Sequence, residues 1–93
     1  MKFKLDINLD DEQEASEFVA KYQFFNTRRE VAKAMGLKGK GAHKLAGELH
    51  SYAFYKVNAI KYRKAGSIAD ALRYEAICDR IYSEGIQPHC ECW

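Results

Sequence analysis

The feature that most constrains the fold is a pair of long helical patterns separated by one short break. Apolar residues recur at helical spacing over residues 42–65 and again over residues 67–84, and Gly66 lies between the two patterns. Glycine is the usual residue just past a helix end, because it adopts the left-handed backbone conformation at little cost. The sequence therefore predicts a long helical hairpin over residues 42–84, followed by a tail over residues 85–93.

Two shorter helices are expected before the hairpin. An acidic run suits a helix N-terminus, where the macrodipole favours negative charge, and predicts a helix over about residues 11–23. Thr27 and Glu30 have the spacing of a capping box, and the helix that they open should end at Gly36. Together with the start of the hairpin, these helices fill residues 11–47.

The first ten residues alternate between apolar and polar side chains. The apolar positions are Phe3, Leu5, Ile7 and Leu9. A period of two predicts a strand within residues 1–10 that buries one face. A lone strand needs a partner for its backbone groups, so we expect either a weaker strand elsewhere or a homodimer through this strand. The expected fold is all-α, a four-helix domain with a helical hairpin at the C-terminus and one short N-terminal β-strand.

Length and composition restrict the chain to a single domain over residues 1–93. Two independent cores in 93 residues would each fall below the roughly 50-residue size at which a core becomes marginal. No apolar run approaches the roughly 18 residues that span a bilayer, and the charged start is unlike a signal peptide, so we expect no membrane partner. Three cysteines make a poor disulfide framework, which favours a cytoplasmic location.

Charge is unevenly distributed along the chain. Residues 1–25 hold three lysines against six acids, residues 26–66 hold ten cations against two acids, and residues 67–93 hold two arginines against five acids. A basic middle of this kind is typical of a surface that binds a polyanion such as nucleic acid. The alternative is that the acidic ends fold back and neutralise the basic middle internally.

The spacing of small and apolar residues over residues 28–47 resembles a bacterial helix-turn-helix motif. Ala32 lies where a small residue lets two helices cross, and Gly36 follows four residues later at the turn. Apolar residues seal the inner faces at Val31, Met35, Leu37, Ala42 and Leu45. The resemblance implies contacts with phosphates and base edges. The nucleic-acid-binding residues that it implies are Arg28, Arg29, Lys33, Lys38, Lys40, His43 and Lys44.

Two departures from the helix-turn-helix pattern affect the expected binding. Gly39 and Gly41 lie near the start of the second helix and would cost about 1 kcal/mol each relative to Ala if helical, so this helix should begin late. No Arg, Asn or Gln occupies the expected reading positions, which hold only Lys and His. We therefore expect binding with little sequence preference.

A second resemblance covers residues 2–35. An alternating strand, an acidic-capped helix and the NTRRE opening of another helix are similar to a ribbon-helix-helix dimer, in which paired strands enter the major groove. That resemblance places Lys2, Lys4, Asp6 and Asn8 at the groove, where Asp6 would repel phosphate. Like the lone strand, it implies a strand-paired dimer.

Aromatic residues interleave with cations in the first helix of the hairpin. Tyr52, Phe54, Tyr55 and Tyr62 alternate with Lys56, Lys61, Arg63 and Lys64. Such a pattern can provide stacking platforms beside a cationic track for single-stranded nucleic acid. It can equally belong to a helix that is buried on two sides, and the spacing of Tyr52 and Tyr55 favours this core role.

Metal binding and catalysis find weaker support. His89, Cys90 and Cys92, with Cys78 or His50 as a fourth ligand, have the atom types for zinc, but Cys-x-Cys is tighter than the usual spacing, so no metal is predicted. The glycines of GLKGKGAHK lack the spacing of a phosphate loop. No nucleophile and base pair can be singled out, so we expect a binding protein without a cofactor, not an enzyme.

The C-terminal half adds two looser resemblances. The segment KYRKAGSIADALRYEAICDRIY is similar to one hairpin of a tetratricopeptide-type domain, and to small proteins of bacteriophages. The sequence predicts a small phage-type nucleic-acid-binding regulator with DNA or RNA as its partner. The alternative is a phage interaction module that docks on a host or defence protein through the exposed face of its hairpin.

Overall fold

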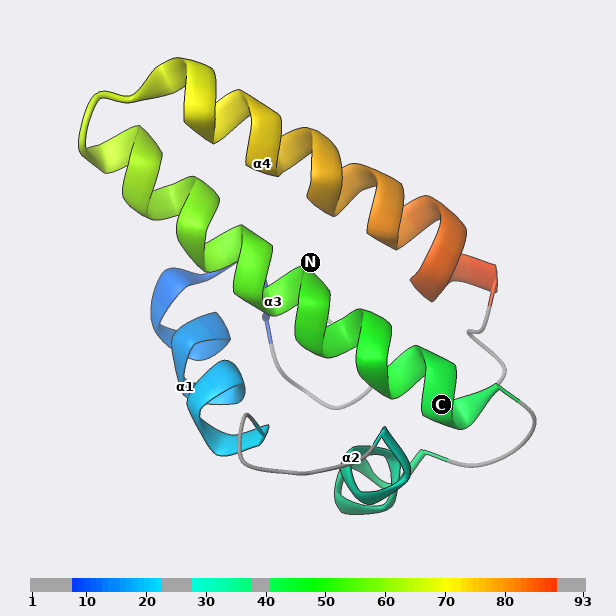
Figure 1. Ribbon diagram of the computed structural model, residues 1–93. Coiled ribbons are helices and arrows are strands. Elements are labelled where there is room, and N and C mark those ends of the chain that lie inside the picture. The colour runs from blue at the N-terminus through cyan, green and yellow to red at the C-terminus, as the bar shows by residue number, and fades with distance from the viewer. Residues whose placement is uncertain (1–7, 23–27, 38–40, 89–93) are drawn as a thin grey trace.

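The computed structural model describes residues 8–22, 28–37 and 41–88, and within α2 it describes residues 28, 29, 31 and 35 by their backbone only. These residues form four α-helices and a terminal π-helical turn (Figure 1). The elements are α1 (Glu12–Tyr22), α2 (Arg28–Met35), α3 (Ala42–Lys64), α4 (Ile68–Ile81) and η1 (Tyr82–Ile86). The described part is therefore all-α, as predicted.

The predicted helical hairpin is present, and α3 and α4 form its two arms. Gly66 joins them with a φ of +83°, and its N–H donates to the Arg63 carbonyl at 3.2 Å. The Ser67 N–H donates to the Tyr62 carbonyl at 2.9 Å, which completes the two hydrogen bonds of a Schellman cap. The chain reverses within the three residues between the helices, so α4 packs along α3 (Figure 1).

The end of α4 differs from the expected helix. We expected an α-helix to about Glu84, but α4 ends at Ile81 and the chain continues as the wider turn η1. In this turn Gly85 packs against Glu48 of α3, and a Cβ on Gly85 would lie 2.6 Å from the Glu48 Cδ. The missing side chain lets η1 fold onto α3, and Ile86 is buried there.

The predicted N-terminal strand is not supported. Residues 1–7 lie outside the described part, and the last two residues of the expected alternation, Asn8 and Leu9, lead into the turn that enters α1. The Asn8 side-chain oxygen accepts the Asp10 N–H at 3.1 Å, and the Asn8 carbonyl accepts the Asp11 N–H at 3.2 Å. Asn8 bonds its own following backbone, which favours a turn over continued strand pairing.

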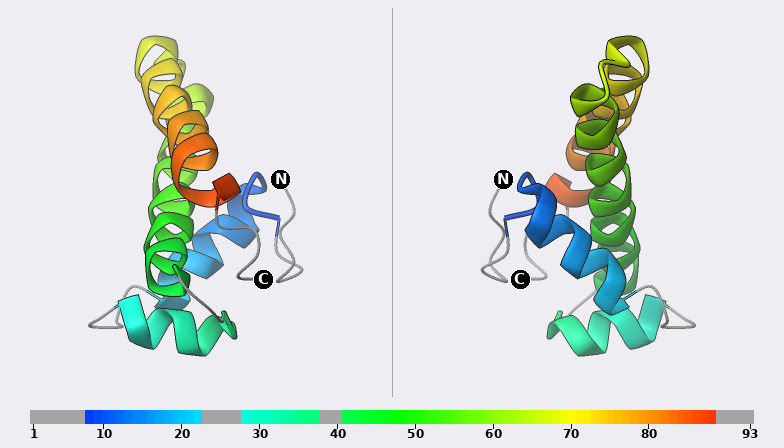
Figure 2. Two further views of the ribbon diagram at one scale, coloured as in Figure 1. Left: turned by 90° about the vertical axis from the view of Figure 1, so that its right-hand side faces the viewer. Right: turned by 90° about the vertical axis from the view of Figure 1, so that its left-hand side faces the viewer.

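Acidic capping begins α1, as the sequence predicted. A carboxylate oxygen of Asp11 accepts the N–H of Glu14 at 3.0 Å, which satisfies one of the free donors of the first turn. The predicted capping box of α2 lies partly outside the described residues, because Thr27 does. Seen from the side, α2 lies across the lower end of the upright hairpin, and α1 lies against α3 (Figure 2).

One core cluster takes side chains from all four helices. Its largest fully buried members are Leu9, Leu45, Leu49 and Cys78. Cys78 serves as the small buried apolar residue that the sequence suggested, and its thiol donates to the Tyr52 carbonyl at 3.8 Å. Burial raises the pKa of the Cys78 thiol to about 11. Among the described helices, none has the length and apolarity to cross a membrane.

Candidate nucleic-acid interface

The segment that resembles a helix-turn-helix contains α2 and the start of α3, and a glycine ends α2. Gly36 ends α2 with a φ of +73°, its N–H donates to the Lys33 carbonyl at 3.1 Å, and the Leu37 N–H donates to the Ala32 carbonyl at 3.0 Å. This is again a Schellman cap, and it turns the chain so that α2 crosses the start of α3 (Figure 2). We call α2, the turn after it and the first two turns of α3 the corner.

The inner face of the corner is sealed by the residues that the spacing predicted. Ala32, Leu37, Ala42 and Leu45 are all buried. The other two expected sealing residues, Val31 and Met35, have side chains outside the described part. Small side chains at 32 and 42 let the two backbones approach closely. The sequence expectation of a late second helix also holds, because α3 begins only at Ala42.

Three of the seven predicted contact residues can be placed by their side chains. Lys33 on α2, and His43 and Lys44 in the first turn of α3, are exposed. Within the described part of the chain, none of these three makes an ion pair. Arg28 and Arg29 lie in the first turn of α2, with side chains outside the described part. Lys38 and Lys40 lie outside the described residues altogether.

Acidic side chains offset the positive charge at one edge of the corner. A surface hollow beside Lys44 is lined by Glu48 of α3 and by residues of the α4–η1 junction, among them Arg80 and Glu84. Two carboxylates and two cations therefore share this hollow. Any polyanion that approaches the corner would bind more favourably on the side of Lys33 and His43 than over the hollow.

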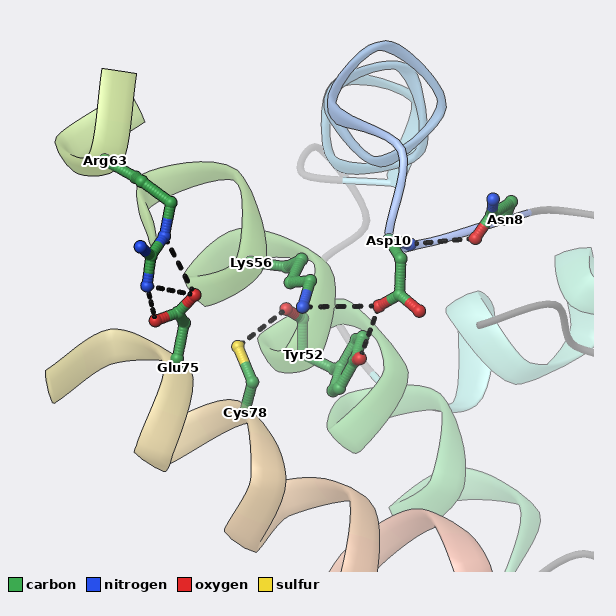
Figure 3. A network of polar contacts seen from close by, with 7 residues as sticks. All are labelled: Asn8, Asp10, Tyr52, Lys56, Arg63, Glu75 and Cys78. Carbon is green, nitrogen blue, oxygen red and sulfur yellow. Dashed lines mark hydrogen bonds and ion pairs between the residues drawn. The ribbon is translucent and has the colours of Figure 1, made fainter. Parts of the chain in front are cut away.

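The other end of α3 uses its cations differently. Lys56 lies 3.4 Å from a carboxylate oxygen of Asp10, and Lys64 pairs with Glu12 at the start of α1. Arg63 reaches across to α4, where its terminal nitrogen lies 2.6 Å from Glu75 (Figure 3). That hydrogen bond lowers the pKa of the Glu75 carboxyl. Internal neutralisation, the alternative left open by the charge pattern, therefore applies to Lys56, Arg63 and Lys64. Lys61 at the same end of α3 makes no ion pair within the described residues.

The interleaved tyrosines pack against other parts of the protein. Tyr52 is buried, and its hydroxyl donates to Asp10 at 2.8 Å (Figure 3). Burial raises the pKa of this phenol to about 12. Tyr55 and Tyr62 both pack on Tyr74 of α4, with ring centroids 5.7 and 5.3 Å apart. The core interpretation is thus confirmed for Tyr52 and Tyr55, and it does not hold for Phe54.

Phe54 remains on the surface and lines a groove that the sequence did not indicate. Its side chain is 48% exposed, and the groove lies between α1 and α3. The lining residues are Ser16, Val19, Ala20, Phe54, Val57, Asn58 and Lys61. Phe54, Asn58 and Lys61 share one face of α3 because they follow one another at spacings of four and three residues, and this pattern could be read from the sequence. The wall that α1 contributes depends on tertiary packing and could not be read from the sequence.

Neither the candidate metal ligands nor the comparisons with known proteins add a further role to the site. Among the described residues no three His, Cys, Asp or Glu side chains gather as a metal site would require, and His89, Cys90 and Cys92 lie outside them. No family model, curated protein or solved structure matches the chain.

Proposed function

We propose that the chain is a small, cytoplasmic, phage-type regulatory protein that binds nucleic acid through the corner. The observation that carries the proposal is the contrast in ion pairing along α3. Lys56, Arg63 and Lys64 are tied to carboxylates, whereas the described cations of the corner have no carboxylate partner within the described part. Lysines without internal partners retain their full attraction for phosphate.

The chemistry of the corner favours contact with the backbone of the nucleic acid over readout of its bases. Lys33 and Lys44 flank the segment that holds Lys38 and Lys40, so four lysines occur within twelve residues. Lysine binds phosphate as a point charge, and the expected reading positions at the start of α3 hold no Arg, Asn or Gln, the residues that make most bidentate contacts with bases. Binding that depends steeply on salt and weakly on sequence is the expected result.

Fluorescence anisotropy of a labelled random duplex and a labelled single strand tests this proposal. Titrations at low and near-physiological salt should give affinities that fall steeply as salt rises. The double variant Lys33→Ala/Lys44→Ala should weaken binding and reduce the salt slope by about one for each phosphate that the protein no longer binds. The matched control is Lys64→Ala/Arg73→Ala, which removes the same charge from exposed side chains away from the corner.

Two results would overturn the proposal. One is the lack of any binding at low salt by the unmodified chain. The other is an equal loss of affinity in the Lys33→Ala/Lys44→Ala variant and in its control, since a general charge effect would then explain the binding. Helical circular dichroism of all variants shows whether a loss comes from unfolding.

The exposed face of α4 supports a second function, docking on a host or defence protein. Ile68 and Leu72 lie one turn apart on this helix and are 45% and 56% exposed. Exposed large apolar side chains in register are typical of a protein contact. A capture experiment that recovers one host protein after nuclease treatment, and loses it with Leu72→Asp, would favour this function over the first.

A homodimer through an N-terminal strand is the remaining part of the proposal. It concerns residues 1–7, whose alternation would let two copies pair edge to edge and present two corners to one nucleic acid. Sedimentation over a range of protein concentrations should show a dimer that a chain lacking these residues does not form. A monomer at every concentration would remove the dimer and leave the corner unaffected.

A further inference from the structure

The groove between α1 and α3 differs in chemistry from two other hollows of the described surface. The hollow along α1 is lined by Glu14 and Glu17, and the hollow beside Lys44 includes two carboxylates. The α1–α3 groove holds no carboxylate, and its one charged lining residue is Lys61. It therefore combines an exposed aromatic ring with a cation and carries no acidic group that would repel an anion.

Each wall of the groove contributes a distinct property. On α1, Ser16 and Ala20 are small and leave the ring of Phe54 accessible from that side. One edge of the half-exposed Phe54 ring packs against Tyr55, with ring centroids 5.5 Å apart and planes at 81°, and this contact favours the orientation seen here. A pre-oriented, accessible ring is suited to stacking with a flat ligand.

The polar groups of the groove are placed beside this ring. The Asn58 side-chain nitrogen donates to the Phe54 carbonyl at 2.9 Å, which holds the amide at the groove and leaves its oxygen as an acceptor. Lys61 follows on the same face of α3, is exposed, and makes no ion pair within the described residues. An aromatic ring, an amide and an ammonium group thus lie in a row.

We propose that this groove binds one unstacked base of a single-stranded nucleic acid, with the base on Phe54 and a neighbouring phosphate at Lys61. The ring of Phe54 and the ammonium group of Lys61 together fit a ligand that consists of a flat ring with an anion attached. Stacking on an aromatic ring accepts any base. The inference rests on the proposed function, and it adds that the nucleic acid is single-stranded where it meets the groove.

The register of α3 connects the groove to the corner. His43 and Lys61 are 18 residues apart, which is about five turns and roughly 27 Å along one face of the helix. A strand that lies along this face would meet the corner at one end and the groove at the other. The lack of Arg, Asn and Gln in the first two turns of α3 agrees with a ligand held by phosphates and stacking.

The decisive experiment crosses a protein change with a ligand change. Binding of a labelled oligothymidylate is compared with binding of a strand of equal length and charge that lacks all bases. Phe54→Ala should weaken binding of the oligothymidylate by about tenfold, the effect of losing one stacked base. It should leave binding of the abasic strand unchanged, because that strand has nothing to stack.

Matched variants separate stacking and charge from general surface effects. Leu72→Ala removes an exposed apolar side chain of α4 and is the control for Phe54→Ala. Lys64→Ala is the control for Lys61→Ala, since both remove one exposed lysine from the same end of α3. Lys61→Ala should weaken both strands, whereas Lys64→Ala should weaken them less. Phe54→Tyr keeps an aromatic ring and should restore binding.

The outcomes distinguish the two proposals. If the unmodified chain binds neither strand nor duplex at low salt, the proposed function fails and this inference falls with it. If it binds, and Phe54→Ala leaves the oligothymidylate affinity unchanged or reduces the affinities for both strands equally, the corner can still be the nucleic-acid site but the groove is not. Phe54→Leu, which keeps an apolar side chain of similar size, should behave like Phe54→Ala and excludes loss of folding as the cause.

Discussion

The two ends of α3 both carry basic residues and use them in different ways. At the C-terminal end, Arg63 and Lys64 bind carboxylates of α4 and α1. At the N-terminal end, His43 and Lys44 extend from the first turn and make no ion pair within the described residues. The comparison shows that net charge along a sequence says little about a binding surface until the internal ion pairs are subtracted.

Packing differs between the same two regions. The corner is sealed by small residues such as Ala32 and Ala42, whereas the far end of the hairpin is held by the rings of Tyr55, Tyr62 and Tyr74. Small residues bring backbones close and leave polar side chains to point outward. Aromatic rings pack α3 against α4 at the far end of the hairpin. The corner thus keeps its described basic side chains free of such packing, and at the other end of α3 Phe54 and Lys61 remain exposed.

The largest effect is expected from emptying the core beneath the corner. Leu45 has no exposed surface, and Leu45→Ala should lower the free energy of unfolding by about 2–5 kcal/mol, the range for a buried leucine that leaves a cavity. Urea unfolding followed by circular dichroism measures the change. Leu72→Ala, on the exposed face of α4, should change stability by less than about 0.5 kcal/mol. Similar losses in both variants would contradict the described core.

A smaller effect is expected from removing the hydrogen bond between Tyr52 of α3 and Asp10 in the segment before α1. Tyr52→Phe removes the hydroxyl that donates to Asp10 and should cost about 1.5–3 kcal/mol, because the acceptor is charged. Urea unfolding at neutral pH measures this loss. A Tyr55→Phe variant serves as the control. An equal loss of unfolding free energy there would show that the hydrogen bond to Asp10 does not stabilise the fold.

The same variant should alter the response to alkali. Burial raises the folded pKa of Tyr52 from 10.0 to about 12, so the stability that the neutral phenol contributes is present below pH 10 and is lost as the pH rises towards 12. Tyr52→Phe cannot ionise there. Its unfolding free energy should therefore fall less steeply between pH 10 and 12 than that of the unmodified chain, and parallel curves would contradict the assignment.

The two glycine turns allow a direct comparison of the regions. Gly36 and Gly66 both have positive φ and open space around the position of a Cβ, so replacing either by Ala should cost about 1 kcal/mol of conformational free energy alone. Thermal unfolding should show equal losses. Only Gly36→Ala, in the corner, should also weaken nucleic-acid binding in the anisotropy assay. Equal effects of both variants on binding would remove the distinction between the two ends.

Helix boundaries were largely predictable from local sequence. The glycines at 36 and 66 mark the ends of α2 and α3, and the residue at which α3 begins follows from the glycines before it. Local signals suffice here because a helix end is decided by the backbone preference of a few residues. They failed for the end of α4, where Gly85 packs against Glu48, a residue far away in the sequence. The expected strand is not supported in the described residues, where Asn8 accepts the Asp10 N–H in the turn before α1.

The composition of the site was less predictable than the fold. The exposed cations of the corner follow from helical spacing, but the ion pairs that neutralise Lys56 and Lys64 join residues more than forty positions apart. Sequence spacing favoured the inward packing of Tyr52 and Tyr55, but it did not show that Phe54 between them lines a groove on the surface. The difference depends on where α1 and α4 lie against α3. Pairings of that range are fixed by the tertiary fold and leave no local pattern.

The smallest effect is expected from the exposed ion pair at the far end of the hairpin. Glu75 accepts hydrogen bonds from Arg63 at 2.6 and 3.0 Å, and this interaction lowers the folded pKa of its carboxyl below the ordinary 4.5. A lowered folded pKa contributes stability that is present above pH 4.5 and is lost as the pH falls through the lowered value. Glu75→Gln should therefore reduce the thermal midpoint slightly at neutral pH and leave it unchanged in strong acid. Solvent screening keeps the effect small, since both groups are at the surface.

The control for this variant is Glu17→Gln, which removes an exposed carboxylate of α1 that makes no ion pair within the described residues. It should not reproduce the dependence on pH. If Glu75→Gln left the midpoint unchanged at every pH, the ion pair between Arg63 and Glu75 would contribute no stability. Arg63 could then bind an external anion at no cost to the fold. The distinction between the two ends of α3 would then shrink to Lys56 and Lys64, and the nucleic-acid surface could extend past Lys61 to the end of the helix.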